Sequence, residues 1–304
     1  MKCPWCGSTW TLRTEGIGLG RQRSDRLMGA GILLYMLGMS YRHSSLFLAA
    51  FACPSSKSSI ERDVASAGQA AEALHRSARQ LGVRVLGVDG TGAALAGSRD
   101  GVLFLVDIDG GKLLWVVWAK ETESAKVRRL VAEAMAQVGA EELRTDEHSV
   151  YEGIVPAERH RLCLAHWRKS KGKRVCELLR RARAEGRPLE VQSLQRLQEL
   201  LALEPRPPTV PEELTRLVRR YIYCRQGLLW QINQLLQHVE RTWESVSDDP
   251  VDPTNNVTER TIGLTLKIRC KTMRGFKSRR KVLTHAYLAS FLRTGGGCDL
   301  RQVI

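Results

Sequence analysis

The N-terminal part of the chain has the spacing of apolar residues that helices need. Apolar positions recur every three or four residues, and serines stand where such helices would begin. Ser40 is a favourable N-cap for the second helix, and Ser55 or Ser56 for the third, because a serine oxygen accepts a hydrogen bond from an otherwise unpaired backbone N–H. The pattern predicts three short helices and a linker helix, at 27–37, from Ser40 onward, at 57–64 and at 65–81.

Strand-like runs rich in apolar and β-branched residues come next. The first three are joined by short links, one of which is the turn at 109–111, so we expect them to form an antiparallel meander. Apolar residues at helical spacing between Val127 and Val138 then predict an amphipathic helix. The expected strands lie at 83–88, 102–108, 113–118, 142–145 and 161–164, with the first ending at Asp89 and the fourth at Asp146.

A long helical stretch separates this α/β region from a last helical segment. Leucines recur at helical spacing on both sides of the proline-rich residues 205–211. The predicted fold class is therefore α/β, with an all-helical insertion inside the α/β core and a helical module before it. The expected boundaries are an arm at 1–24, the helical module at 25–81, a core at 82–167 and 247–293, the insertion at 168–246 and a tail at 294–304.

The charge of the chain indicates a polyanionic partner. Lys and Arg number 47 against 32 Asp and Glu, a formal net charge of +15. Residues 159–187 hold eleven basic and two acidic residues, and residues 260–281 hold nine basic residues and no acid. A solvated helix face normally interleaves both signs, so one-signed blocks indicate phosphate contacts. Nucleic acid is the first expectation, and an acidic membrane surface is the second.

The cysteines indicate a reducing compartment. Eight are present, and apart from Cys3 and Cys6 they are scattered, without the density of a disulfide framework or a recognisable signal peptide. We expect a cytoplasmic, nucleoid-associated protein with no membrane segment, since the apolar run at 27–39 is too short to span a bilayer. Cys3 and Cys6 have zinc-knuckle spacing, which predicts half of a Zn²⁺ ribbon or, alternatively, a flexible basic arm.

Three acids occupy places suited to metal-dependent phosphodiester chemistry. Asp89 follows the first strand, Asp146 follows the fourth, and Glu259 lies on the last helical stretch. Such carboxylates can hold two Mg²⁺ or Mn²⁺ ions about 4 Å apart, which activate the attacking group and stabilise the leaving oxygen. Each acid alone has a simpler reading. Asp89 could begin a turn, Asp146 could cap a helix, and Asn256 with Glu259 could form a capping box.

The motifs around these acids resemble those of bacterial insertion-sequence DDE transposases, in the group that shares features with Mutator-like elements. The resemblance covers about 83–292 and implies a ribonuclease H-like core that cuts and joins DNA with Asp89, Asp146 and Glu259. It also implies a Cys-x-x-His motif after the second acid. The quoted motifs are Gly87-Val88-Asp89-Gly90-Thr91-Gly92, Arg144-Thr145-Asp146, Cys163-Leu164-Ala165-His166-Trp167 and Thr254-Asn255-Asn256-Val257-Thr258-Glu259-Arg260.

The same resemblance assigns partners and supporting residues. Double-stranded DNA, as element ends and target, is the expected partner, and a homodimer or larger assembly would join two ends. The module at 25–81 has helix-turn-helix proportions, although an ordinary three-helix packing unit is the alternative. Active-site support is expected from Cys163, His166, Asn256 and Arg260; base contacts from Lys57, Ser59 and Arg62; and phosphate contacts from Arg168, Lys169, Arg269, Lys271, Arg274, Lys277 and Arg279.

Two other functions fit parts of the sequence. A transposase-derived protein that binds DNA without cutting it would keep the same charge pattern. The segment 87–92 also resembles the first phosphate loop of actin-like kinases, some of which are fused to a helix-turn-helix. That reading needs a second glycine-rich loop and an adenosine motif downstream, and the sequence offers only Gly295–Gly297 near its end.

Overall fold

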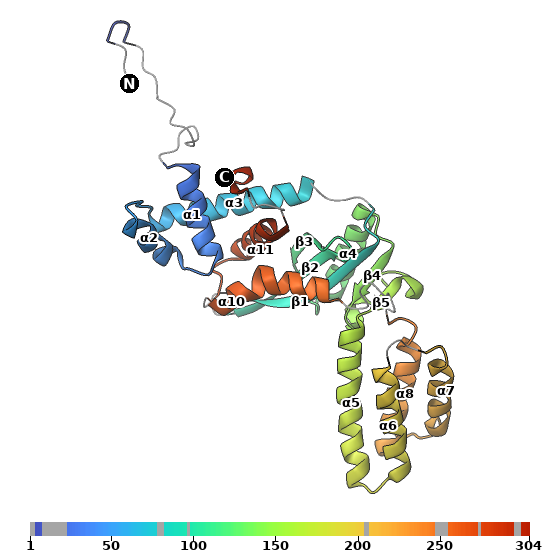
Figure 1. Cartoon of the computed structure of the whole chain (residues 1–304). Coiled ribbons are helices and arrows are strands. Elements are labelled where there is room, and N and C mark those ends of the chain that lie inside the picture. The colour runs from blue at the N-terminus through green and yellow to red at the C-terminus, as the bar shows by residue number, and fades with distance from the viewer. Residues whose placement is uncertain are drawn as a thin grey trace.

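The protein is a mixed α/β chain built on one five-stranded sheet, as shown in Figure 1. The computed structural model describes residues 4–7, 23–77, 82–95, 98–203, 207–246, 255–272, 275–294 and 299–304. In the sheet the strand order is β3-β2-β1-β4-β5. The first three strands pair antiparallel, whereas β4 pairs parallel with β1 and β5 parallel with β4. The strands are β1 (Val85–Leu95), β2 (Ser98–Asp107), β3 (Lys112–Trp118), β4 (Glu142–Thr145) and β5 (His160–Leu162).

Both faces of the sheet are covered by helices, because side chains alternate along each strand. Leu86, Val88 and Leu105 pack on one face with α4 (Ser124–Val138). Phe104 and its even-numbered neighbours on β2 pack on the other face with the N-terminal and C-terminal helices. The apolar spacing that predicted a helix between Val127 and Val138 is therefore the buried face of α4, and the prediction is confirmed.

The N-terminal helices are α1 (Asp25–Met36), α2 (Tyr41–Ala50) and α3 (Lys57–Ser77). The side chain of Ser40 accepts a hydrogen bond from His43 N–H at 3.1 Å, and that of Ser56 accepts one from Ser59 N–H at 3.1 Å, so the predicted caps are confirmed. The short third helix and the linker helix expected after it are one continuous helix. Its buried side packs against α11 (Arg279–Thr294) and against α1 and α2.

The helical insertion forms a unit with its own core. Figure 1 shows it projecting away from the β4–β5 side of the sheet, with the N-terminal helices on the other side of the molecule. Its apolar residues come from all four helices and include the fully buried Trp167. The insertion begins earlier than expected, because α5 starts directly after Cys163. The helices are α5 (Leu164–Ala184), α6 (Pro188–Ala202), α7 (Val210–Tyr221) and α8 (Gly227–Thr242).

After the insertion the chain returns to the sheet as a nearly continuous helical stretch. It contains α9 (Asn256–Ile262), the π-helical turn η3 (Gly263–Lys267) and α10 (Ile268–Thr272), followed by α11. Short 3₁₀ turns complete the described structure: η1 (Ser149–Tyr151), η2 (Ala157–Arg159) and η4 (Leu300–Gln302).

The largest difference from the sequence prediction concerns β1. The strand was expected to end at Asp89, but it continues to Leu95, because its second half pairs residue by residue with β2, from Asp89 opposite Phe104 to Leu95 opposite Ser98. Asp89 therefore lies in the middle of a strand and not in a turn. Within the described residues, no helix is long and apolar enough to cross a lipid bilayer.

The close approach of α3 and α11 predicts that Gly68 tolerates no side chain. A Cβ atom there would lie 2.7 Å from the backbone oxygen of Thr284, which cannot move without displacing α11. We expect Gly68→Ala to lower the free energy of unfolding by about 1–3 kcal/mol in chemical denaturation. Gly172→Ala is the matched control, because that helical glycine of α5 has no atom within 4 Å of the added Cβ, and the change should stabilise by about 0.5–1 kcal/mol. Equal effects of the two substitutions would contradict this packing.

Candidate active site

The register of the sheet places Asp89 and Asp146 side by side. β1 and β4 are parallel neighbours, and Gly87 lies opposite Arg144. Asp89 lies two residues further along β1, and Asp146 directly follows the last residue of β4, so the two acids stand at the same level beside one another. The sequence could predict this pairing, because both acids were expected to follow strands of one sheet.

The third acid reaches the same place because α9 packs directly on β1. A Cβ atom on Gly87 would lie 2.9 Å from Oδ1 of Asn255, so only glycine lets the helix come this close. The Asn255 side-chain amide donates to the Val88 carbonyl at 3.1 Å. Glu259 lies on the first turn of α9 and is therefore carried to the Asp89 side of the sheet.

The supporting asparagine is Asn255 rather than Asn256, which was expected from the sequence. Asn255 is fully buried, whereas Asn256 is exposed at the start of α9. Asn255 is also the N-cap residue of this helix, and its side chain makes no capping bond. The alternative in which Asn256 and Glu259 form a capping box is therefore wrong, because Asn256 is not the N-cap residue of α9.

Cys163 and His166 contact the same helix end. The backbone N–H of Asn255 donates to Cys163 Sγ at 3.2 Å, and His166 Nε2 lies 3.4 Å from Glu259 Oε1. Burial raises the pKa of the Cys163 thiol, and backbone N–H groups oppose that rise. The ligand atoms of Cys163, His166 and Glu259 all lie within 4.8 Å of one another. Of the four residues expected to support the site, Cys163 and His166 thus do meet Glu259, whereas Asn256 and Arg260 are exposed.

The electrostatics show how crowded the carboxylates are. The pKa of Asp89 is raised from 3.8 to about 7, first by burial and then by the negative charges of Asp146, Glu121 and Glu259. Lys267 opposes the rise and does not cancel it. Around Asp89, negative charge therefore exceeds the positive charge of the described residues. The chain as a whole is the opposite, with a net charge of +15.

Glu121 is a fourth acid at this site that the sequence did not reveal. It follows β3, and a Cβ atom on Gly90 would lie 2.8 Å from its Oε2 atom. The buried Tyr151 hydroxyl donates to Glu121 Oε1 at 2.7 Å, and burial together with the Glu121 charge raises the pKa of Tyr151 above its ordinary value. Glu121 lies in a polar turn with no distinguishing pattern, so only the folded sheet brings it to Asp89.

Glu147 connects the acidic site to the helical insertion. The residue directly follows Asp146, and its carboxylate bonds both His238 of α8 and the buried Lys171 of α5, each at 2.5 Å. Burial alone would raise the pKa of Glu147, but these two partners lower it below its ordinary value. The carboxylate is therefore ionised at neutral pH and helps to fix the insertion at the end of β4.

Most residues predicted to contact DNA lie on the surface. Arg62 is exposed and donates to the Ser58 carbonyl, and Ser59 is partly exposed with its hydroxyl 3.0 Å from that of Ser56. Arg274 lies outside the described residues. Of the two cysteines with zinc-knuckle spacing, Cys3 also lies outside the described residues, and Cys6 is exposed. The lysines from both basic segments and from α3 are exposed: Lys57, Lys169, Lys271 and Lys277.

Three arginines of the predicted phosphate contacts are engaged within the protein. Arg269 is buried, lies 4.1 Å from the centre of the Tyr35 ring and donates to the Met39 carbonyl at 3.0 Å. It ties the C-terminal helices to the N-terminal module, so we correct its assignment from phosphate contact to packing residue. Arg168 donates to the Leu203 carbonyl at 2.7 Å, and Arg279 pairs with Asp100 at 2.8 Å while keeping most of its side chain exposed.

A basic groove of about 650 Å³ runs between α5 and α8. Lys173, Arg174 and Arg241 line it together with Trp230, an aromatic side chain that is 43% exposed. Lys171 and His238, which bond Glu147 beside Asp146, line the same groove. The groove therefore begins near the acidic site and extends along the helical insertion.

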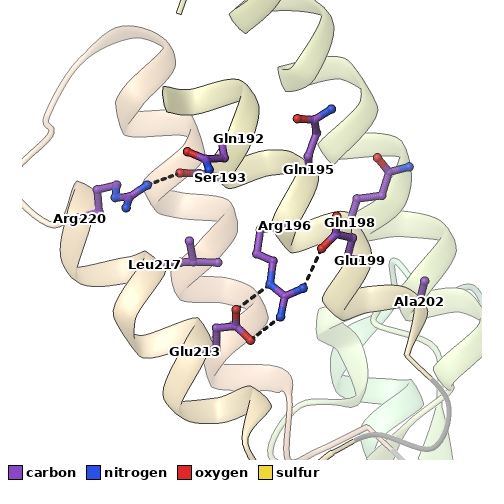
Figure 2. A pocket seen from close by; sticks show the side chains of 10 residues that line it. All are labelled: Gln192, Ser193, Gln195, Arg196, Gln198, Glu199, Ala202, Glu213, Leu217 and Arg220. Carbon is purple, nitrogen blue, oxygen red and sulfur yellow. Dashed lines mark hydrogen bonds and ion pairs between the residues drawn. The ribbon is translucent and has the colours of Figure 1, made fainter. Parts of the chain in front are cut away.

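A second hollow, of about 760 Å³, lies between α6 and α7 and is drawn in Figure 2. Its charged groups are satisfied internally. Arg196 forms two bonds with Glu213, at 2.6 and 2.9 Å, and one with Glu199 at 2.7 Å. Arg220 donates to the Ser193 hydroxyl at 2.9 Å. In Figure 2 the bonds of Arg196 to Glu213 and of Arg220 to Ser193 thus cross the hollow, which makes this a structural contact between two helices.

No protein-family model matches the chain, and no curated protein matches its sequence.

The raised pKa of Asp89 predicts how stability depends on pH. A carboxyl whose pKa is 3.8 in the unfolded chain and about 7 in the folded protein stabilises the fold fully below pH 3.8, and this contribution is lost as pH rises toward 7. Asp89→Asn cannot ionise, so the melting temperature of this variant minus that of the wild type should increase between about pH 4 and pH 7 in metal-free buffer. Excess Mg²⁺ should reduce the difference. A difference that is constant with pH would show that the pKa of Asp89 is not raised in the folded protein.

Proposed function

We propose that the protein is a DNA transposase of the DDE type, which cuts DNA strands at the ends of a mobile element and joins them to a target. The observation that carries the proposal is the convergence of Asp89, Asp146 and Glu259 from three distant segments. Burial, together with the negative charges of Asp146, Glu121 and Glu259, raises the pKa of Asp89 to about 7. A site that repels its own carboxylates needs cations, and the proposed function supplies them as metal ions.

The strand order supports the same proposal. In a ribonuclease H-like core, three antiparallel strands are followed by a helix and by parallel strands, and the acids stand on the first strand, after the fourth strand and on a late helix. The sheet order β3-β2-β1-β4-β5 and the positions of the three acids agree with that arrangement. We therefore assign the ribonuclease H-like fold to this core as part of the proposal.

The donor set fits Mg²⁺ or Mn²⁺. Asp89, Asp146 and Glu259 offer carboxylate oxygens, which hard divalent cations prefer, and Glu121 adds a fourth negative charge nearby. When bound, two such ions activate the attacking hydroxyl and stabilise the leaving oxygen of an in-line displacement. The chain itself fixes the two aspartates on adjacent strands, holds α9 against β1 through Asn255, and uses Lys267 to offset part of the charge.

The surface charge supports a DNA partner. The exposed start of α3 presents Lys57, Ser59 and Arg62, as the last helix of a helix-turn-helix module would toward base edges. The groove between α5 and α8 combines basic side chains with the exposed Trp230, a pairing suited to a nucleic-acid backbone and its bases. Exposed Lys271 and Lys277 extend the basic surface on the C-terminal segment.

The three carboxylates should be individually essential for strand cleavage. Asp89→Asn, Asp146→Asn and Glu259→Gln should each lower Mg²⁺-dependent cleavage of element-end DNA by at least about 1000-fold, because each removes several kcal/mol of transition-state stabilisation. DNA binding, measured by fluorescence anisotropy, should stay within about threefold of the wild-type value.

Glu133→Gln is the matched control, since that exposed acid on α4 lies on the outer side of the helix and should leave cleavage unchanged. Near-normal cleavage by any one of the three variants would remove that residue from the assignment. Wild-type protein that binds element ends but cuts none of them under any divalent cation would favour the alternative, a transposase-derived binding protein.

Two kinds of DNA contact should separate by mutation. Lys57→Ala with Ser59→Ala should weaken binding to element ends by about 1–3 kcal/mol and hardly affect random DNA, because base contacts discriminate between sequences. Lys271→Ala with Lys277→Ala should weaken both equally and reduce the slope of log affinity against log salt by about two units. Affinity titrations at several salt concentrations measure both effects. A change of sequence preference in the second pair, or none in the first, would overturn the division.

A further inference from the structure

Two helix ends meet at Cys163, His166 and Glu259. Cys163 is the N-cap of α5, and His166 follows on the first turn of the same helix. Glu259 lies on the first turn of α9, whose N-cap residue Asn255 donates its backbone N–H to Cys163 Sγ at 3.2 Å. The three side chains present one sulfur, one ring nitrogen and one carboxylate oxygen within 4.8 Å of one another.

The spacing within this group fits ligands on one metal ion better than a direct ion pair. His166 Nε2 and Glu259 Oε1 are 3.4 Å apart. A charge-assisted hydrogen bond would bring such atoms to about 2.7–2.9 Å. Two ligands bound at about 2.05 Å to a tetrahedral zinc ion would lie about 3.3 Å apart. The observed separation is therefore that of two corners of a coordination tetrahedron.

The surroundings of the sulfur suit a metal thiolate. Cys163 is 1% exposed, and this burial raises the pKa of its thiol. Its sulfur accepts hydrogen bonds from the backbone N–H groups of Asn255, Ala165 and His166, which oppose that rise. These donors favour the thiolate form, and a bound metal ion removes the thiol proton outright. Sulfur and imidazole together select zinc over magnesium, which takes oxygen ligands.

We propose that Cys163, His166 and Glu259 bind a Zn²⁺ ion through Sγ, Nε2 and Oε1, with a fourth position open to water. The inference goes beyond the proposed function, because zinc binding requires neither DNA nor the two aspartates. Its role is to fix α9 to α5, and so to hold Glu259 in place. Oε1 of Glu259 faces His166, so Oε2 of the same carboxylate is left to act together with Asp89 and Asp146.

The test is metal content and metal spectroscopy of the full chain carrying Cys3→Ser and Cys6→Ser, so that the N-terminal thiols cannot contribute. We expect this protein to retain one zinc per chain after dialysis, measured by plasma mass spectrometry. With Co²⁺ in place of zinc it should show a thiolate charge-transfer band in the near ultraviolet and tetrahedral bands in the visible.

Cys163→Ser in that background should abolish the thiolate band, whereas Cys176→Ser, an exposed cysteine on the same helix, should keep it. His166→Gln should weaken Zn²⁺ affinity by at least about 100-fold, since changing a residue that only orients a metal ligand already costs about 10–100-fold. The histidine is partly exposed, so this variant keeps the test valid if Cys163→Ser does not fold.

The outcomes separate this site from the catalytic proposal. Asp89→Asn should lose cleavage and keep its zinc. A wild-type protein that binds zinc but never cuts DNA would overturn the proposed function and leave the zinc site standing. A protein without bound zinc or a Co²⁺–thiolate band would overturn the zinc site, and would leave Cys163 and His166 as groups that position Glu259 directly. Unchanged zinc affinity in both the Cys163→Ser and His166→Gln variants would overturn it as well.

Discussion

Repulsion between carboxylates is the constraint on which the rest of the structure depends. Asp89 on β1 and Asp146 directly after β4 stand at the same level, and Glu121 and Glu259 add their charge. Burial first, and then these negative charges, raise the pKa of Asp89 to about 7. Carboxylates that repel one another would move apart if they lay on flexible segments. Here they are held in place by β1 in the middle of the sheet, by the packing of α9 on Gly87, and by the hydrogen bond from Asn255 to the Val88 carbonyl.

The same constraint explains the contacts that surround the site. Glu147, next to Asp146, is turned away into bonds with Lys171 and His238, which removes one negative charge from the cluster and anchors the helical insertion. Because the insertion is anchored there, its basic groove begins beside the acids. Arg269 ties the C-terminal helices to the N-terminal module through Tyr35 and Met39. The acidic site is thus connected to the basic groove through Glu147, and the C-terminal helices are connected to the N-terminal module through Arg269.

Much of this architecture follows from local patterns in the sequence. Serine caps, helical spacing and β-branched runs predicted α1, α2, α4 and the positions of the strands, because these signals act over a few residues. The meeting of Asp89 with Asp146 was predictable from strand order. Glu121 was not, because its turn carries no pattern and only the pairing of β3 with β2 brings it near. The burial of Arg269 and the role of Asn255 in place of Asn256 result from tertiary packing, which cannot be predicted from charge counts or from a motif.

Metal binding by Asp89, Asp146 and Glu259 can be tested by iron-mediated cleavage of the protein. Fe²⁺ replaces Mg²⁺, ascorbate and peroxide generate radicals at the metal, and mass spectrometry maps the backbone cuts. We expect cuts next to Asp89, Asp146 and Glu259 that are suppressed by excess Mg²⁺ and absent in Asp89→Asn. Cuts confined to other parts of the chain, or cuts at these positions that excess Mg²⁺ leaves unchanged, would contradict it.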